Sequence, residues 1–275
     1  MESLMRSEKN IEAIERLGKK IKLDLFKKFC LVKEGHPGSV LSIFDITNVL
    51  YEGGYINISK DNNMNDTFIM SKGHAAAVQY PFLVRRNIIS EKDWERWGSG
   101  DSILRIFGNK EIPGIDVTSG SLGHGIGIAC GMALADKLDN IQRNIFVVVS
   151  EGELYEGSTW ESLLFLNHHN LTAVKIILDV NRNMILGRPE DSIKLEDISK
   201  KFVSFGIAVK RFDGHDYKQI FDSLDFLVED GMEPRAIIAD TVKGKGISFM
   251  EDKAESHYWA GITEDQMKVI IKELS

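Results

Sequence analysis

The sequence predicts an α/β fold, with a mostly parallel sheet and helices on both of its faces. Four short apolar runs, at residues 145–149, 174–180, 207–212 and 236–241, have the length and composition of buried strands. Helical stretches separate these runs, and such alternation is typical of a parallel sheet covered on both sides. The chain contains neither an internal repeat nor a Pro/Ser-rich linker, so we expect a single domain over residues 1–275.

The N-terminal segment, about residues 8–52, is predicted to be helical. Apolar residues from Ile11 to Phe29 follow one another at steps of three and four, which predicts an amphipathic first helix. The sequence Gly35-His36-Pro37-Gly38 breaks this pattern, and a second helix is expected over residues 39–51.

Three further helices are expected at residues 156–169, 195–205 and 216–229. The longest uncharged stretch, residues 117–135, contains five glycines and several polar side chains. It therefore predicts a loop that enters a packed helix rather than a membrane span.

Charge and cysteine content exclude several classes of function. The chain has 34 basic and 41 acidic residues, a net charge of −7, and no block of five basic residues, so we expect no nucleic-acid partner. The N-terminus has no apolar core of signal-peptide length, so neither export nor a membrane role is expected. Cys30 and Cys130 are too few for a disulfide framework or a thiolate metal site, which favours a reducing cytoplasm.

Two loops at the expected carboxyl edge of the sheet carry polar residues. Ser150-Glu151-Gly152-Glu153 follows one strand, and Asn181-Arg182-Asn183 follows the next. Because parallel strands end at one edge, Glu151, Asn181 and a backbone carbonyl near Asn183 could supply the protein oxygens of a Mg²⁺ site. The alternative is that Asn181 only shapes a turn.

These paired loops resemble the diphosphate-binding signature of thiamine diphosphate enzymes, in which Gly-Asp-Gly follows one strand and an asparagine follows the next. Other segments are similar to transketolase motifs, in family order, and the resemblance covers about residues 10–265. The segments are Gly35-His36-Pro37-Gly38, Ser71-Lys72-Gly73-His74, Thr118-Ser119-Gly120-Ser121-Leu122-Gly123, Trp160-Glu161 and Lys243-Gly244-Lys245-Gly246.

The resemblance is to the first of three transketolase domains, the one that binds the diphosphate and the metal. It implies the thiamine diphosphate-binding fold and the N-terminal subunit of a split transketolase, with thiamine diphosphate and Mg²⁺ (or Ca²⁺ or Mn²⁺) as cofactors. A separate chain would supply the pyrimidine-binding and C-terminal domains, in an expected two-plus-two heterotetramer. The implied reaction moves a two-carbon ketol unit from a ketose (phosphate) to an aldehyde.

The same resemblance implies roles for three histidines. His74 would lie beside the diphosphate, where an imidazole can donate a hydrogen bond to a phosphate oxygen. His36 corresponds to the substrate-side histidine that assists proton transfer, with a simple loop residue as the alternative. His257 matches a late histidine that reaches the cofactor, although here Trp259 follows it.

Further residues carry over from the family motifs. Glu156 resembles the carboxylate of a relay between two active sites, and its alternative role is to stabilise a helix N-terminus. Lys243 and Lys245 either close a loop over the site or are simply solvated. The expected cofactor-binding residues are His74, Gly120, Ser121, Leu122, Ser150, Glu151, Gly152, Glu153, Asn181 and His257.

Two departures from the family pattern bear on function. Ser150-Glu151 stands where the family has Gly-Asp, and Mg²⁺ tolerates little error in the position of a carboxylate. Phe107 stands where another substrate histidine is expected, which suggests a less hydroxylated or differently oriented acceptor. Two alternatives therefore remain: another acyloin- or ketol-condensing enzyme of a specialised sugar pathway, and a non-catalytic scaffold subunit.

Overall fold

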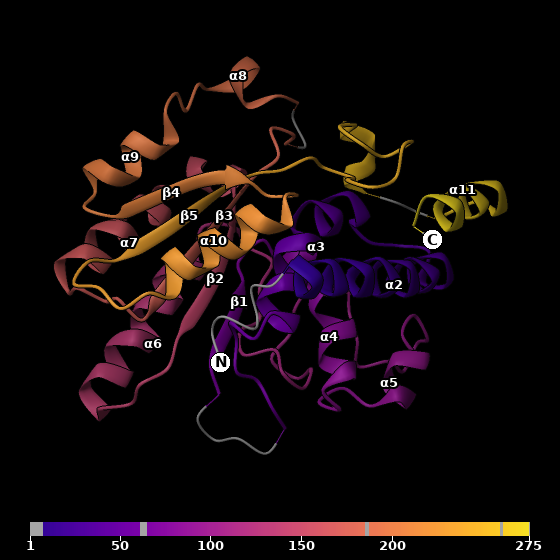
Figure 1. The fold of residues 1–275 in the computed structure, drawn as a ribbon, viewed down its shortest axis with the longest axis horizontal. Coiled ribbons are helices and arrows are strands. Elements are labelled where there is room, and N and C mark those ends of the chain that lie inside the picture. The colour runs from indigo at the N-terminus through magenta and orange to yellow at the C-terminus, as the bar shows by residue number, and fades with distance from the viewer. Residues whose placement is uncertain (1–7, 61–64, 185–186, 259–260, 275) are drawn as a thin grey trace.

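The computed structural model describes residues 8–60, 65–184, 187–258 and 261–274, so Trp259 lies outside it. Its centre is a sheet of five parallel strands in the order β1-β2-β3-β5-β4 (Figure 1). The strands are β1 Thr67–Met70, β2 Ile145–Ser150, β3 Val174–Val180, β4 Ala208–Asp213 and β5 Arg235–Asp240. The predicted parallel sheet is therefore confirmed, and four of its strands lie within one residue of the predicted positions.

Side chains of successive strand residues point to opposite faces, and this divides the core into two layers. Phe146 and Val148 of β2 pack in the layer under the helices of the N-terminal half, whereas Val147 and Val149 pack in the other layer. Figure 1 shows the first two helices and α6 and α7 on opposite sides of the sheet. The first layer is covered by α2 (Glu8–Val32), α3 (Pro37–Glu52), α4 (Tyr80–Arg85), α5 (Glu91–Glu95), α10 (Tyr217–Val228) and α11 (Glu264–Leu274), and the second by α6 (Gly125–Asp139), α7 (Gly157–His168) and α9 (Ile198–Ser204).

The predicted break between the first two helices places a histidine at the edge of the sheet. Gly35 has a φ of 137°, and a Cβ there would lie 2.8 Å from the Phe29 ring, so the turn favours glycine. Pro37 then occupies the first turn of α3, where a missing N–H costs nothing. His36 precedes it as the N-cap residue of α3.

Residues 117–135 form a loop followed by the start of α6, as predicted. No helix of the described residues is long and apolar enough to cross a membrane. Short 3₁₀ segments follow two of the strands, η1 (Gly73–Gln79) after β1 and η2 (Glu151–Tyr155) after β2, and η3 (Ala254–His257) and α8 (Pro189–Ser192) complete the described elements. Because all five strands are parallel, their following loops meet at one edge.

Packing of the second layer gives a direct test of the fold. Leu178 is fully buried in β3, whereas Leu164 of α7 is 60% exposed. We expect Leu178→Ala to lower the free energy of unfolding by about 2–5 kcal/mol, because it leaves a cavity in a packed core. Leu164→Ala is the matched control and should change it by less than about 0.5 kcal/mol. Urea unfolding of both variants measures the difference, and equal losses would contradict this packing.

Candidate active site at the carboxyl edge of the sheet

A cavity of about 540 Å³ opens where the loops after β1, β2, β3 and β5 meet. Most of the predicted site residues line it, although they come from segments far apart in the sequence. These are His36, His74, Gly120, Leu122, Ser150, Glu151, Gly152, Asn181, Asn183 and His257. The cavity is also lined by Ser39, Lys72, Phe107, Tyr155, Met184, Ser192, Ile193 and Lys243.

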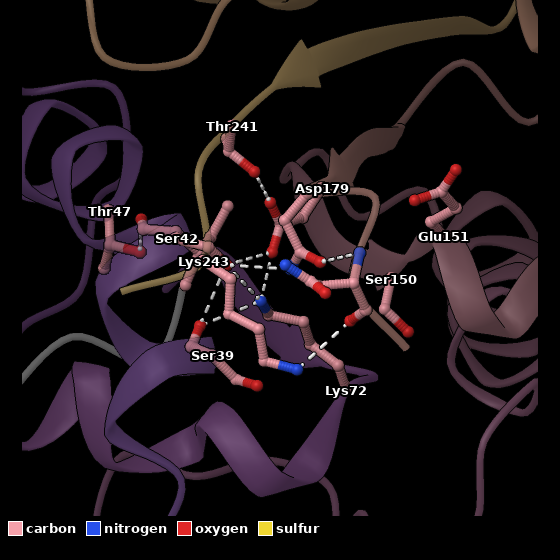
Figure 2. A network of polar contacts seen from close by, with 12 residues as sticks. Ser39, Ser42, Thr47, Lys72, Ser150, Glu151, Asp179, Thr241 and Lys243 are labelled. Carbon is pink, nitrogen blue, oxygen red and sulfur yellow. Dashed lines mark hydrogen bonds and ion pairs between the residues drawn. The ribbon is translucent and has the colours of Figure 1, made fainter. Parts of the chain in front are cut away.

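A buried ion pair between Lys72 and Asp179 holds one wall of the cavity (Figure 2). Neither side chain is more than 1% exposed, and the Lys72 ammonium also donates to the carbonyl of Ser39 at 3.0 Å. The Asp179 carboxylate accepts from the Ser42 hydroxyl at 2.5 Å and from the Thr241 hydroxyl. Burial opposes ionisation of Asp179, but Lys72 and these hydroxyls outweigh it and keep its pKa below the usual range.

Lys243 brings a second buried ammonium to the cavity, but without a carboxylate partner among the described residues. It is 1% exposed and donates to the carbonyl of Asn183 at 3.1 Å and to His257 Nδ1 at 3.0 Å. Burial, reinforced by the charge of Lys72, lowers the pKa of Lys243 to about 8. The two lysines of the segment Lys243-Gly244-Lys245-Gly246 therefore differ in burial and in pairing, because Lys245 is partly exposed and pairs with Glu251 at 3.4 Å.

Three histidine rings form a cluster beside these ammonium groups. The ring centroids of His36, His74 and His257 lie 5.1–5.3 Å apart. Burial and the nearby lysines lower the pKa of each, to about 4 for His257, so the rings are neutral near pH 7. His36 Nδ1 is buried without a hydrogen-bond partner in the described structure, which leaves it available to a ligand.

The three predicted metal ligands all line the cavity, and each is oriented by a bond within the protein. Glu151 accepts from the backbone N–H of Arg182 at 3.0 Å, and Asn181 Oδ1 accepts from that of Asn183 at 3.1 Å. The Asn183 carbonyl accepts from Lys243. Among the described residues no group of three His, Cys, Asp or Glu side chains is placed to hold a metal ion. A cation here would therefore need further oxygens from a bound small molecule, as Mg²⁺ takes them from phosphates.

Three other predicted site residues do not line the cavity. Glu153 is fully buried, and its carboxylate accepts from the backbone N–H groups of Ser150 at 2.8 Å and Gly123 at 3.0 Å, and from the Ser71 hydroxyl. It thus ties three loops together. Glu156 is exposed at the N-cap of α7, and Ser121 is exposed beside a separate small cavity.

Sequence reasoning missed two features of the site. Asp179 sits inside the apolar run Val174–Val180, and a carboxylate within a buried strand is itself a signal that a cation faces it. Phe107 and Tyr258 both meet the His36 ring edge to face, at 5.7 and 5.5 Å, and the sequence analysis assigned no role to Tyr258, although this residue directly follows His257.

The fold and the site together define a class: α/β proteins with a cavity at the carboxyl edge of a parallel sheet, here lined by two buried ammonium groups. Residues 14–274 match the family model described as transketolase, thiamine diphosphate binding domain. The chain therefore belongs to the transketolase family of ketol transferases and corresponds to the domain that this model describes.

Known relatives fall into two groups by length. The chain is 35% identical to an apulose-4-phosphate transketolase subunit from Actinobacillus succinogenes, over 87% of each chain. It is 31% identical to the protein of the same name from Phocaeicola vulgatus, over 96% of this chain and 95% of that one. Against the transketolase structure from Campylobacter jejuni, the TM-score is 0.85 at 25% identity, covering 98% of this chain but 43% of that one. The chain thus spans less than half of the solved transketolase.

The Lys72–Asp179 pair generates a stability prediction. Lys72→Met should lower the free energy of unfolding by about 3–5 kcal/mol, because it leaves the buried Asp179 carboxylate without its cation. The double variant Lys72→Met/Asp179→Leu should lose less than the single one. Lys245→Met, which removes a partly exposed lysine, should cost under about 1 kcal/mol. Urea unfolding would contradict the role of the pair if Lys72→Met and Lys245→Met behaved alike.

The histidine cluster generates a pH prediction. An NMR titration of the His257 ring should give a midpoint near pH 4, because burial and Lys243 disfavour the charged ring. Lys243→Met should raise this midpoint, whereas Lys245→Met should not. In the unfolded chain histidine titrates near pH 6.5, so the unfolded state takes up the proton first and the fold loses stability as the pH falls from about 6.5 to 4. A wild-type midpoint near 6.5 would refute this account.

Proposed function

We propose that this chain is the thiamine diphosphate- and Mg²⁺-binding subunit of a split transketolase. The observation that carries the proposal is that the oxygens of Glu151, Asn181 and Asn183 share one cavity with the neutral histidines and with the Lys243 ammonium, which has no carboxylate partner in the described part of the chain. A diphosphate with its metal matches this set, because phosphate oxygens complete the metal shell and the ammonium offsets the remaining negative charge.

The cavity walls fit such a ligand. A Cβ added at Gly152 would have as its nearest atom the Ser150 hydroxyl oxygen at 3.8 Å, so the backbone beside the loop is open to close approach. The partnerless Nδ1 of His36 also needs a ligand, since an unsatisfied buried nitrogen is costly. Glu151, Asn181 and the Asn183 carbonyl would hold the metal, with Mg²⁺, Ca²⁺ or Mn²⁺ as candidates, and Lys243 and His74 would hold the diphosphate.

Thiamine diphosphate, when bound, supplies the nucleophilic carbon that allows the bond next to a ketose carbonyl to be cleaved. The protein residues around it bind and orient. Because burial and Lys243 lower the pKa of His36, its imidazole stays neutral and can accept a proton from a substrate hydroxyl. Lys243 contributes fixed positive charge in a partly dry site, where it is stronger than in water. His257, bonded to Lys243, orients that ammonium.

A second chain would complete the site. Phe107, Ile193 and Tyr258 are 42%, 69% and 53% exposed; Phe107 and Ile193 line the cavity, and Tyr258 packs on the His36 ring. An apolar rim of this kind suits burial against a protein surface.

Two relatives that match along nearly their whole length are named as subunits, which supports a partner that carries the pyrimidine-binding and C-terminal domains in a two-plus-two assembly. Glu156, exposed and outside the cavity, would serve only across that interface. The unpaired Cys30 and Cys130 suit a reducing cytoplasm.

The substrates would be small ketoses and aldehydes. Relatives are named for apulose-4-phosphate and for 6-deoxy-6-sulfo-D-fructose, the latter 30% identical over 87% of this chain, so the substrates of this group vary. Phe107 presents an apolar ring to the cavity, edge-on to His36. We therefore propose an acceptor with fewer hydroxyls, or differently placed ones, near this ring.

Calorimetric titration with thiamine diphosphate and Mg²⁺, on the chain with its partner, tests the proposal. Asn181→Ala and Glu151→Ala should each weaken binding at least ~10-fold, because each removes a metal ligand. Glu233→Ala, which removes an exposed carboxylate before β5, should leave binding unchanged. A wild-type complex that binds no cofactor would indicate a scaffold role instead. Product analysis with a panel of aldehydes then separates ketol transfer from other condensations.

A further inference from the structure

A second buried polar cluster lies beside the site, and the function proposed above does not use it. The Lys22 ammonium contacts Asp45 Oδ1 at 3.0 Å, and His215 Nδ1 lies 2.8 Å from Asp45 Oδ2. The side chains of all three are at most 10% exposed. None of them lines the cavity that holds the histidine cluster. Their role must therefore be indirect, through what they hold in place.

The hydrogen bonds of His215 fix its tautomer. The backbone N–H of Val242 donates to His215 Nε2 at 2.9 Å, so this nitrogen must carry a lone pair rather than a proton. The proton of the neutral ring then sits on Nδ1 and is donated to Asp45. Burial alone would raise the pKa of Asp45, but Lys22 and His215 outweigh it and lower the pKa to about 2, so the acceptor is charged near pH 7.

The turn that carries His215 is shaped to reach Val242. Gly214 donates its N–H to the Asp240 carbonyl at 2.8 Å, and a Cβ there would lie 2.5 Å from Thr241 Cγ2. A side chain at position 214 would push the turn away from the end of β5. The His215 backbone is held in turn by the Asp213 carboxylate, which accepts its N–H at 2.9 Å.

Val242 directly precedes Lys243, whose buried ammonium lines the cavity. We propose that His215 is a positioning residue, which holds the Val242 backbone so that Lys243 faces the diphosphate. This inference rests on the proposed function for its ligand. In this arrangement Lys22 and Asp45 fix the neutral imidazole of His215, and the imidazole in turn fixes the backbone N–H of Val242 beside the site.

Three variants of the full chain with its partner test this. His215→Leu removes both hydrogen bonds, whereas His215→Gln keeps an acceptor for Val242 and a donor for Asp45. His168→Leu is the matched control, because His168 is exposed at the end of α7. We expect His215→Leu to weaken thiamine diphosphate binding by about 3- to 10-fold, in line with the loss of the hydrogen bond that holds Val242, and His215→Gln to recover most of it.

Two readouts do not depend on the cofactor. Nitrogen NMR of the wild-type chain should show the His215 proton on Nδ1, and finding it on Nε2 would overturn the proposal. Hydrogen exchange of the Val242 and Lys243 amides should be faster in His215→Leu than in the wild type, and slow again in His215→Gln. Equal exchange in all three would also overturn it, even if His215→Leu were too unstable for binding studies.

The outcomes separate this inference from the proposed function. If the wild type binds thiamine diphosphate and His215→Leu binds it equally well, the positioning role is wrong and the function stands. If the wild type binds none, the proposed function is wrong, and so is the claim that His215 positions Lys243 for the diphosphate. Exchange and tautomer data still decide whether His215 holds Val242.

Discussion

The buried pair of Lys72 and Asp179 is the interaction on which the geometry of the site depends. A carboxylate with no exposed surface must have all its oxygens satisfied, or the fold loses several kcal/mol. Asp179 meets this demand with groups from three other segments: Lys72 after β1, Ser42 in α3 and Thr241 after β5. One desolvated charge thus joins three strand ends and a helix, and the cavity forms at the place where they meet.

The two buried lysines of the cavity have different electrostatic roles because, among the described residues, only Lys72 is paired with a carboxylate. Lys72 is neutralised by Asp179, so its charge stabilises the structure. Lys243 contacts a carbonyl and an imidazole, which orient it without cancelling its charge. Burial, reinforced by the charge of Lys243, lowers the pKa of His36 and His257 and keeps these rings neutral near pH 7. The site therefore combines a buried ammonium with rings that can still accept protons, a combination suited to an anionic cofactor and to proton transfer from hydroxyl groups.

Local patterns predict the architecture well, because apolar runs and motif order are local properties. They fail where burial depends on distant segments. The strand β1 has four residues and follows a polar stretch, so its apolar run is too short to recognise. The sequence groups Glu153 with Glu151 as a cofactor ligand, but the tight 3₁₀ turn η2 directs it to Ser71 and Gly123 instead. Lys243 has the sequence context of a solvated lysine, but contacts with the Asn183 carbonyl and with His257, which belong to other loops, hold it in a buried position.

Helix α3 emerges as the support that fixes the segment after β5. Ser42 and Asp45 are three residues apart, so they lie on the same face of the helix. Ser42 reaches Asp179, which holds Thr241, and Asp45 reaches His215, which holds Val242. Two independent networks therefore fix consecutive residues, and the residue after them is Lys243. Because both networks are buried and charged, neither can relax without a desolvation cost. The backbone just before the ammonium is thus held by Asp179 and His215, neither of which lines the cavity.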